Sequence, residues 1–213
     1  GNIENLVRFY RDNGADELLI FDISSGDTAH EQAISNIKSI CSAAEIPVMA
    51  AGNINRMEDV KKLLYAGCAK VVLNFSKANN ISLLEEVSKR FGKEKMAVCI
   101  SSTEEFTANQ ALIESFADEV LALDTIQDEI HACSSIKIIL HTEVSKTAAL
   151  KSLLQKDSVY ALSGAYISSL DISLQDFKAD CKADGIPVVT FESAIAWADF
   201  KLNSDGLIPV VVQ

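Results

Sequence analysis

Two aspartates stand at matching places in the sequence, each directly after a short apolar run. Asp22 follows the run at 18–21, and Asp124 follows the run at 120–123. Carboxylates at strand ends can do general acid and base chemistry when they reach the reacting proton. The simpler interpretation, which we favour, is structural: each carboxylate accepts hydrogen bonds from N–H groups of the following loop. Both residues remain candidates for an acid–base pair.

Histidines and cysteines give no pattern of a metal centre. His30, His131 and His141 are scattered without the spacing of metal ligands. The five cysteines contain no C-x-x-C and lie mostly within apolar stretches. We therefore expect no metal and no cofactor, and we interpret the cysteines as reduced, buried thiols of a cytoplasmic protein.

Short continuous apolar runs alternate with longer segments of helical periodicity. Continuous runs indicate strands buried on both faces, as in a parallel sheet covered by helices. Strict alternation leaves an open doubly wound sheet or a closed barrel, and a closed barrel needs eight strands. The expected strands are 18–22, 47–51, 70–74, 96–101, 119–124, 137–141 and 159–162, and the expected helices are 28–44, 57–66, 82–91, 107–116, 127–133, 146–155 and 174–183.

Two internal matches lie about half a chain apart. Segment 15–22 recurs as segment 117–124 with five of eight positions identical. Further along, 81–83 opens a helix ended by Gly92 that leads to strand 96–98, and 172–174 opens a helix ending near Gly185 that leads to the apolar run 186–189. Repeats in the same order favour a barrel made of two half-barrels over an open sheet.

A family resemblance is carried by the pieces 9–10, 14–18, 21–23, 46–48, 52–54, 63–71 and Asn74. On these pieces, the stretch 3–102 resembles the ribulose-phosphate-binding barrels of histidine biosynthesis. It is most similar to the cyclase subunit of imidazole glycerol phosphate synthase, and next to the ribotide isomerase of the same pathway. The family barrel begins with a strand that carries a catalytic aspartate. The resemblance thus implies an α/β fold, a (β/α)8 TIM-type barrel built from two half-barrel repeats, with the first strand missing from this chain.

The resemblance also implies catalysis by two carboxylates, one on the first strand of the family barrel and one on the fifth. The position matching the second is Ser101, whose hydroxyl has no comparable capacity to accept a proton. Glu104 and Glu105 could reach in from the loop, although the two are more simply a solvated pair at a helix start. This serine predicts a barrel that has lost its activity.

In the family, phosphates bind at loops where glycine and helix N-termini let backbone N–H groups approach them. The matching loops here are eroded, with nine glycines in the whole chain. A weak site for a phosphorylated ribotide, or for a phosphate or sulfate ion, is still expected at the barrel mouth. Its candidate residues are Gly52, Asn74, Ser76, Ser163 and Gly164.

A second resemblance closes the chain. Segment 197–213 looks like the opening of phosphoribosyl-AMP cyclohydrolase, with the string Lys-x-Asn-x-Asp-Gly-Leu-Ile-Pro at 201–209. We therefore divide the chain into a barrel at 1–192 and, at 193–213, a linker with the first strand-like segment of a cyclohydrolase-like module. The chain is then the N-terminal part of a longer fused protein.

Composition bounds the partners. The 213 residues carry a net charge of −11, which disfavours nucleic acid and anionic membranes, and 48% are apolar, as in a globular domain.

A barrel without its first strand would expose two sheet edges. We expect the apolar run 207–212 to fill that place or to pair at an edge, within the chain or in a homodimer.

Three functional hypotheses follow. The first is a catalytically degenerate histidine-biosynthesis barrel, fused to cyclohydrolase and pyrophosphohydrolase modules. The second is an active ribotide isomerase or cyclase in which Glu104 or Asp124 supplies one of the acids. The third is another phosphosugar-binding enzyme on the same fold, because fold alone does not determine function.

Overall fold

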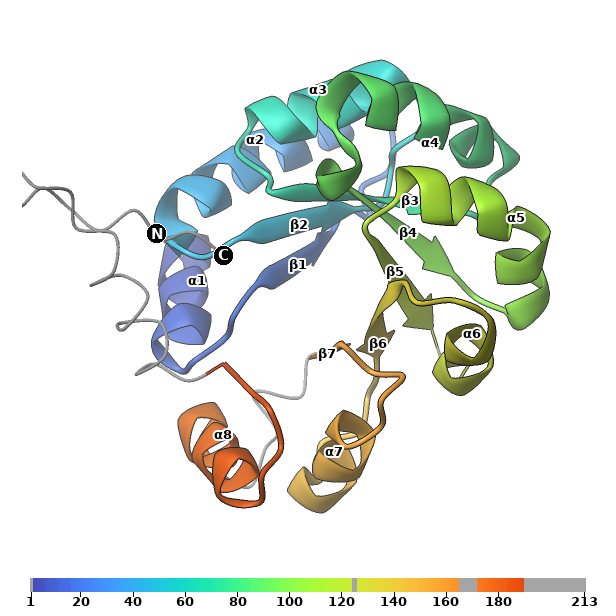
Figure 1. The fold of residues 1–213 in the computed structure, drawn as a ribbon. Coiled ribbons are helices and arrows are strands. Elements are labelled where there is room, and N and C mark those ends of the chain that lie inside the picture. The colour runs from blue at the N-terminus through green and yellow to red at the C-terminus, as the bar shows by residue number, and fades with distance from the viewer. Residues whose placement is uncertain (1, 124–125, 165–171, 190–213) are drawn as a thin grey trace, which may run out of the picture.

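The computed structural model describes residues 2–123, 126–164 and 172–189, and these form a nearly closed barrel (Figure 1). Seven parallel strands follow one another in sequence order around the sheet. They are β1 (Leu18–Phe21), β2 (Val48–Ala51), β3 (Lys70–Asn74), β4 (Met96–Ile100), β5 (Glu119–Leu123), β6 (Lys137–His141) and β7 (Ala161–Ser163).

Helices alternate with the strands and cover the outside of the sheet. They are α1 (Asn2–Asp12), α2 (Asp27–Ala44), α3 (Met57–Tyr65), α4 (Ala78–Phe91), α5 (Thr103–Phe116), α6 (Gln127–Cys133), α7 (Thr147–Leu154) and α8 (Leu174–Ala183), with a short 3-10 helix at Lys93–Lys95. The parallel order and the covering helices confirm the TIM-type barrel expected from the sequence.

Apolar side chains pack on both faces of the sheet, as the continuous runs predicted. The outer layer joins strand residues such as Val71 and Val98 to helix residues such as Leu84 and Phe106. The inner cluster holds strand residues alone, namely Met49, Ala51, Val72, Ala97, Cys99, Leu121 and Ile139 with Leu19, Leu123 and Ala161 at its margin. This inner packing makes the barrel a filled core rather than a pore.

The barrel is open at one seam. Among the described strands, β1 pairs with β2 alone and β7 pairs with β6 alone. Both edge strands are only partly buried, whereas every residue of β2 and β4 is buried. Outside the seam, α8 meets the first part of the chain: Gln175 Nε2 donates to the Asp12 carbonyl at 2.7 Å, and Lys178 pairs with Asp16 at 2.7 Å. The layout fits a (β/α)8 barrel that lacks one strand.

The internal repeat corresponds to equivalent places in the barrel. Segment 15–22 contains β1 and segment 117–124 contains β5, four strands further around the sheet. Helices α4 and α8 stand in the same relation. The bounds of α8 are those predicted, whereas α4 begins at Ala78 rather than at 82. Asn80, in the added turn, donates to the Asn74 carbonyl at 3.1 Å and ties this turn to the end of β3.

Other element boundaries also shift. Helix α5 begins at Thr103 rather than at 107, because the Ser102 hydroxyl accepts from the Glu105 N–H at 3.2 Å and caps the helix. The run 186–189, the counterpart of strand 96–98, is not a strand. Instead Ile186 donates its N–H to Cys181 at 2.8 Å and is buried among residues of α7 and α8, and Pro187 has no N–H to offer a sheet.

Within the described ranges, none of the helices combines the length and apolar character needed to cross a membrane. The expected division at 192/193, the string 201–209 and the run 207–212 lie outside the described residues.

Candidate functional site

The carboxyl ends of the parallel strands meet at one end of the barrel, where barrel enzymes place their active sites. At the ends of β3 and β4, Asn74 Oδ1 accepts the Ser76 N–H at 2.9 Å, and the Ser76 hydroxyl lies 3.5 Å from the Ser101 hydroxyl. Phe75 between them is turned away and fully buried. Asn74, Ser76 and Ser101 therefore form one polar group at the mouth.

Of the two glutamates expected near Ser101, Glu105 is the one that contacts it. Glu105 Oε2 accepts the Ser101 N–H at 2.8 Å and lies 3.2 Å from the Ser101 hydroxyl. Glu104 is exposed beside it, and hydrogen bonds from its own N–H and from Ser102 hold the pKa of its carboxyl below the usual value. The Glu105 carboxylate thus reaches back from α5 over the end of β4.

Ser163, at the end of β7, is paired with the strand beside it. Its hydroxyl lies 3.1 Å from His141 Nδ1, and the His141 ring meets the Phe21 ring edge-on at 6.0 Å between centroids. Gly164 follows and is half-buried. On this side, the mouth of the barrel is therefore lined by the Ser163 hydroxyl, the His141 imidazole and the Phe21 ring. Ser163 and Gly164 lie far around the sheet from Asn74.

Gly52 has a steric role in the loop after β2. Its φ is +86°, and a Cβ added there would overlap the carbonyl oxygen of Asp22. Only glycine permits this approach of the β1 and β2 ends. The requirement exists whether or not a phosphate binds nearby.

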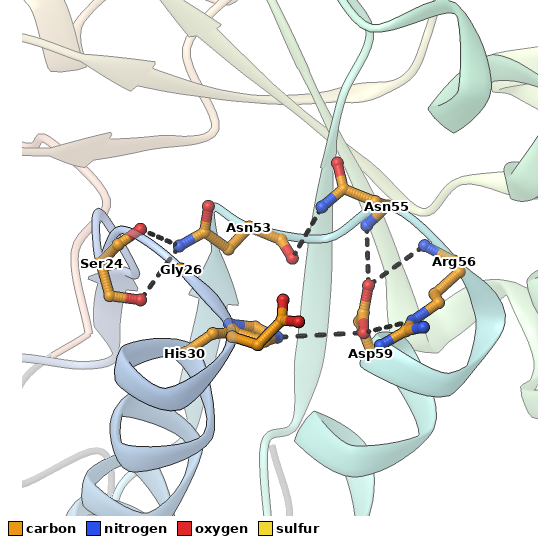
Figure 2. Close-up of a pocket in the computed structure, with 8 residues that line it drawn as sticks. Ser24, Gly26, His30, Asn53, Asn55, Arg56 and Asp59 are labelled. Atoms are coloured by element: carbon orange, nitrogen blue, oxygen red, sulfur yellow. Dashed lines mark hydrogen bonds and ion pairs between the residues drawn. The ribbon is translucent and has the colours of Figure 1, made fainter.

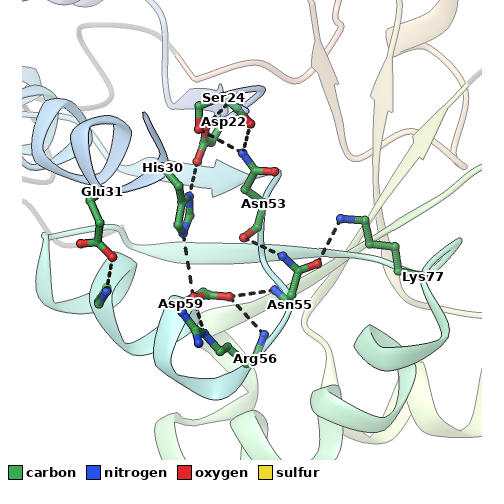
Figure 3. Close-up of polar contacts among 10 residues, drawn as sticks. Asp22, Ser24, His30, Glu31, Asn53, Asn55, Arg56, Asp59 and Lys77 are labelled. Carbon is green, nitrogen blue, oxygen red and sulfur yellow. Dashed lines mark hydrogen bonds and ion pairs between the residues drawn. The ribbon is translucent and has the colours of Figure 1, made fainter. Parts of the chain in front are cut away.

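Asp22 lies in a closed polar arrangement, shown in Figure 3. One carboxylate oxygen accepts the Ser24 N–H at 2.8 Å, and the other lies 2.5 Å from His30 Nδ1 on α2. Burial acts to raise the pKa of this carboxyl, but the hydrogen bonds from Ser24 and His30 outweigh it and hold the pKa below its ordinary value. Asp124 lies outside the described residues, so the proposed pairing of the two aspartates stays a prediction.

A second buried carboxylate completes this group. His30 Nε2 lies 3.9 Å from Asp59 Oδ1, and both Asp22 and Asp59 have side chains only 4% exposed. Asp59 accepts the N–H groups of Asn55 and Arg56 at 3.0 and 3.2 Å, and the Arg56 guanidinium at 3.2 Å. Two buried carboxylates thus flank the His30 imidazole, and the Arg56 guanidinium lies beyond Asp59.

The group borders a polar cavity of about 390 Å³, seen in Figure 2. The Asn53 amide donates to the Ser24 carbonyl at 2.7 Å and so joins the first two loops. Lys77, just before α4, donates to Asn55 Oδ1 at 3.3 Å and so joins the loop after β3 to the loop after β2. The lining residues are Ser24, Gly26, Asp27, His30, Asn53, Asn55, Arg56 and Asp59. Hydrogen-bonding groups of both kinds are available here for a polar ligand.

The opposite end of the barrel carries an ionic cluster. Lys70 pairs with Asp118 at 2.9 Å and with Glu119, and Lys137 lies 3.3 Å from Asp118. The Lys70 and Glu119 side chains are 11% and 5% exposed. Burial and the nearby Glu119 charge raise the pKa of Glu17 at the same end. Across the described residues, no three side chains of His, Cys, Asp or Glu converge as a metal site requires.

Comparison with known proteins decides the family. The model of the family described as "Histidine biosynthesis protein" matches residues 1–151 of the 213. The chain belongs to this histidine biosynthesis family. It is similar to imidazole glycerol phosphate synthase subunit HisF of Campylobacter concisus, at 33% identity over 102 residues, and of Azobacteroides pseudotrichonymphae, at 35% over 102 residues. HisF of Staphylococcus aureus strain Newman is 34% identical over 102 residues.

These matches cover 48% of this chain and 40–41% of the relatives' own length. The membership in the histidine biosynthesis family agrees with the resemblance of stretch 3–102 and with the barrel. The match of the family model ends at residue 151, so it does not include the segment 197–213.

Proposed function

We propose that this chain is a histidine-biosynthesis barrel domain that does not itself catalyse ribotide isomerisation or cyclisation. The observation that supports this proposal is the arrangement of side chains at the end of β4. The position that resembles the family's second carboxylate is Ser101, and the neighbouring Glu105 uses its carboxylate to hold the Ser101 N–H and hydroxyl at 2.8 and 3.2 Å. A carboxylate bound in this way is poorly placed to exchange protons with a substrate.

As its ligand we propose a phosphorylated ribotide at the loops after β2 and β3. Asn55 and Lys77 already meet there, and the Lys77 ammonium is a cation suited to a phosphate. Asn74 and Ser76 continue the polar surface toward Ser101. Gly52 allows the close approach of the loops, and Ser163 with Gly164 would meet the far end of an extended ligand.

We further propose that in its natural setting this barrel precedes a cyclohydrolase, and a pyrophosphohydrolase beyond it, within one cytoplasmic protein. The string at 201–209 supports this proposal through its resemblance to the start of phosphoribosyl-AMP cyclohydrolase. Pairing of the exposed β1 or β7 edge in a homodimer is part of the same proposal.

The second candidate is an active isomerase or cyclase in which Glu105 replaces the missing carboxylate. The contact between Glu105 Oε2 and Ser101 favours it, because it places an acid at the end of β4. Glu104 is the matched control, since it is the neighbouring acid on the same helix turn and is exposed.

One experiment separates the two candidates. The chain is assayed with the ribotide substrates of the cyclase and of the isomerase, and ligand binding is measured by calorimetry up to millimolar concentration. Saturable binding without turnover supports the degenerate barrel. Turnover that is lost in Glu105→Gln and kept in Glu104→Gln establishes the active enzyme instead, and no binding of any ribotide overturns the ligand assignment.

A further inference from the structure

Two cysteine side chains meet on the outside of the barrel. Cys41 lies on α2, and Cys68 lies just before β3. Their sulfur atoms are 3.9 Å apart, and both thiols are free. All five cysteines fall within the described ranges, and no other pair among them is this close. Cys133 is exposed and donates its thiol to the Ile130 carbonyl at 3.2 Å.

The backbone fixes this contact. Gly67 has a φ of +109°, and a Cβ added there would lie 3.0 Å from the Cβ of Cys41. The turn is held by the Gly67 N–H on the Leu64 carbonyl at 3.1 Å and by the Cys68 N–H on the Leu63 carbonyl at 3.2 Å. Glycine therefore lets α2 come close enough for its cysteine to touch the next one.

The two thiols differ in access. Cys41 is partly exposed, whereas Cys68 is 5% exposed. An oxidant from solution therefore reaches Cys41 first, and Cys68 is held behind it. The hydrogen bond between them lowers the pKa of Cys41 and raises that of Cys68. This is the order expected of an attacking thiol followed by a resolving thiol.

We propose that Cys41 and Cys68 are a peroxide-sensitive thiol pair that closes to an intramolecular disulfide. The Cys41 thiol loses its proton, the thiolate attacks one oxygen of hydrogen peroxide, and the O–O bond breaks to give a sulfenic acid and hydroxide, which takes up that proton to form water. The Cys68 sulfur then attacks the sulfenic sulfur, and a second water leaves. In sum two thiols lose two hydrogens and one peroxide is reduced to two waters.

The geometry allows the bond. A disulfide needs a sulfur–sulfur distance of about 2.05 Å, so each sulfur must move by roughly 1 Å. Cys68 precedes β3, so the bond would form at the end of the barrel opposite the mouth, and the proposal is independent of ribotide binding.

The test treats the full chain with equimolar hydrogen peroxide, removes the peroxide, and then alkylates the remaining thiols in denaturant, where the buried cysteines also react. We expect the number of alkylated cysteines to fall from five to three, with Cys41 and Cys68 joined in one peptide pair that dithiothreitol releases. Cys41→Ser and Cys68→Ala should each abolish the cross-link, and Cys133→Ser should leave it unchanged.

Circular dichroism checks that each variant is folded. Because Cys41 is partly exposed, Cys41→Ser decides the outcome even where the buried Cys68→Ala variant does not fold. The proposal is overturned if Cys41 and Cys68 stay alkylatable while Cys133 is oxidised, or if the cross-link that forms contains another cysteine.

Discussion

At the scale of single residues, Gly52 shows most directly how the loop after β2 is constrained. Gly52→Ala places a Cβ against the Asp22 carbonyl and in a backbone conformation with φ of +86°. We expect the free energy of unfolding, measured with urea, to fall by about 3 kcal/mol, from steric overlap added to backbone strain.

Gly26→Ala is the matched control for this prediction. Gly26 has a φ of +85°, but a Cβ there meets nothing within 4 Å. Its substitution should cost only the backbone strain, about 1 kcal/mol. Equal losses in the two variants would contradict the steric role of Gly52.

Asp22 gives a prediction on pH. Its folded-state pKa is lowered from 3.8, so its contribution to stability is complete above the unfolded-state pKa and is lost as the pH falls through the folded-state value. Asp22→Asn should lower the free energy of unfolding at pH 7 by about 1–3 kcal/mol, because charged hydrogen bonds to Ser24 and His30 are lost.

The measurement is a series of urea unfolding curves from neutral to acid pH. The difference between the wild-type chain and Asp22→Asn should shrink below pH of about 4. A difference that stays constant across the series would show that the Asp22 carboxylate is not stabilised by its charge.

The sequence singled out Asp22 but not its partners. The apolar run before it marked a strand end, which is a local signal. His30 and Asp59 come from α2 and α3, and their approach depends on how these two helices pack. Likewise Glu104 and Glu105 were both named near Ser101, but which of them contacts it depends on the start of α5, which lies at Thr103 rather than at 107.

At the scale of elements, the ionic cluster at the end of the barrel opposite the mouth joins β3, β5 and β6. Lys70 is the buried cation of this cluster, with Asp118 and Glu119 as its partners. Lys70→Met keeps the length of the side chain but leaves these carboxylates uncompensated. We expect the free energy of unfolding to fall by about 3–5 kcal/mol.

Lys137→Met is the matched control, since Lys137 meets the same Asp118 from a side chain that is 44% exposed. Its loss should cost less than about 1 kcal/mol. Thermal or urea unfolding of both variants checks the prediction, and a larger effect of Lys137→Met would contradict it.

Element types and order were predictable because apolar runs buried on both faces are a strong signal. The residues at which the helices begin were less predictable from the sequence. Helix α4 begins early because Asn80 bonds the end of β3, a contact between elements that periodicity does not encode. The run 186–189 shows the same limit: it has the composition of a strand, but Ile186 packs on α7 and α8 instead.

At the scale of the whole molecule, the seam predicts unequal protection of the strands. The Leu18 N–H at the start of β1 donates to the Pro47 carbonyl just before β2, and the Asp22 N–H just after β1 donates to the Ala51 carbonyl of β2. The alternation of the strand turns the Leu19 and Phe21 N–H groups toward the seam. Hydrogen exchange followed by NMR should find these two amides exchanging faster than those of β4, by on the order of 100-fold.

The amides of Leu18 and Asp22 serve as internal controls, since they lie on the same strand and are hydrogen-bonded. Protection of Leu19 and Phe21 equal to that of β4 would contradict the open seam and would indicate a further strand paired with β1. The barrel itself was predicted from the half-chain repeat, because two copies in the same order require a closed arrangement more than an open one.

Two side-chain contacts join α8 to the beginning of the chain outside the seam. Lys178 pairs with Asp16 and Gln175 donates to the Asp12 carbonyl, both before the start of β1, so α8 borders the gap between β7 and β1. A polypeptide that later occupied this gap would have to slide in along the barrel axis or part these two contacts. The order of assembly therefore matters: a guest strand is accommodated most easily before α8 docks on the beginning of the chain.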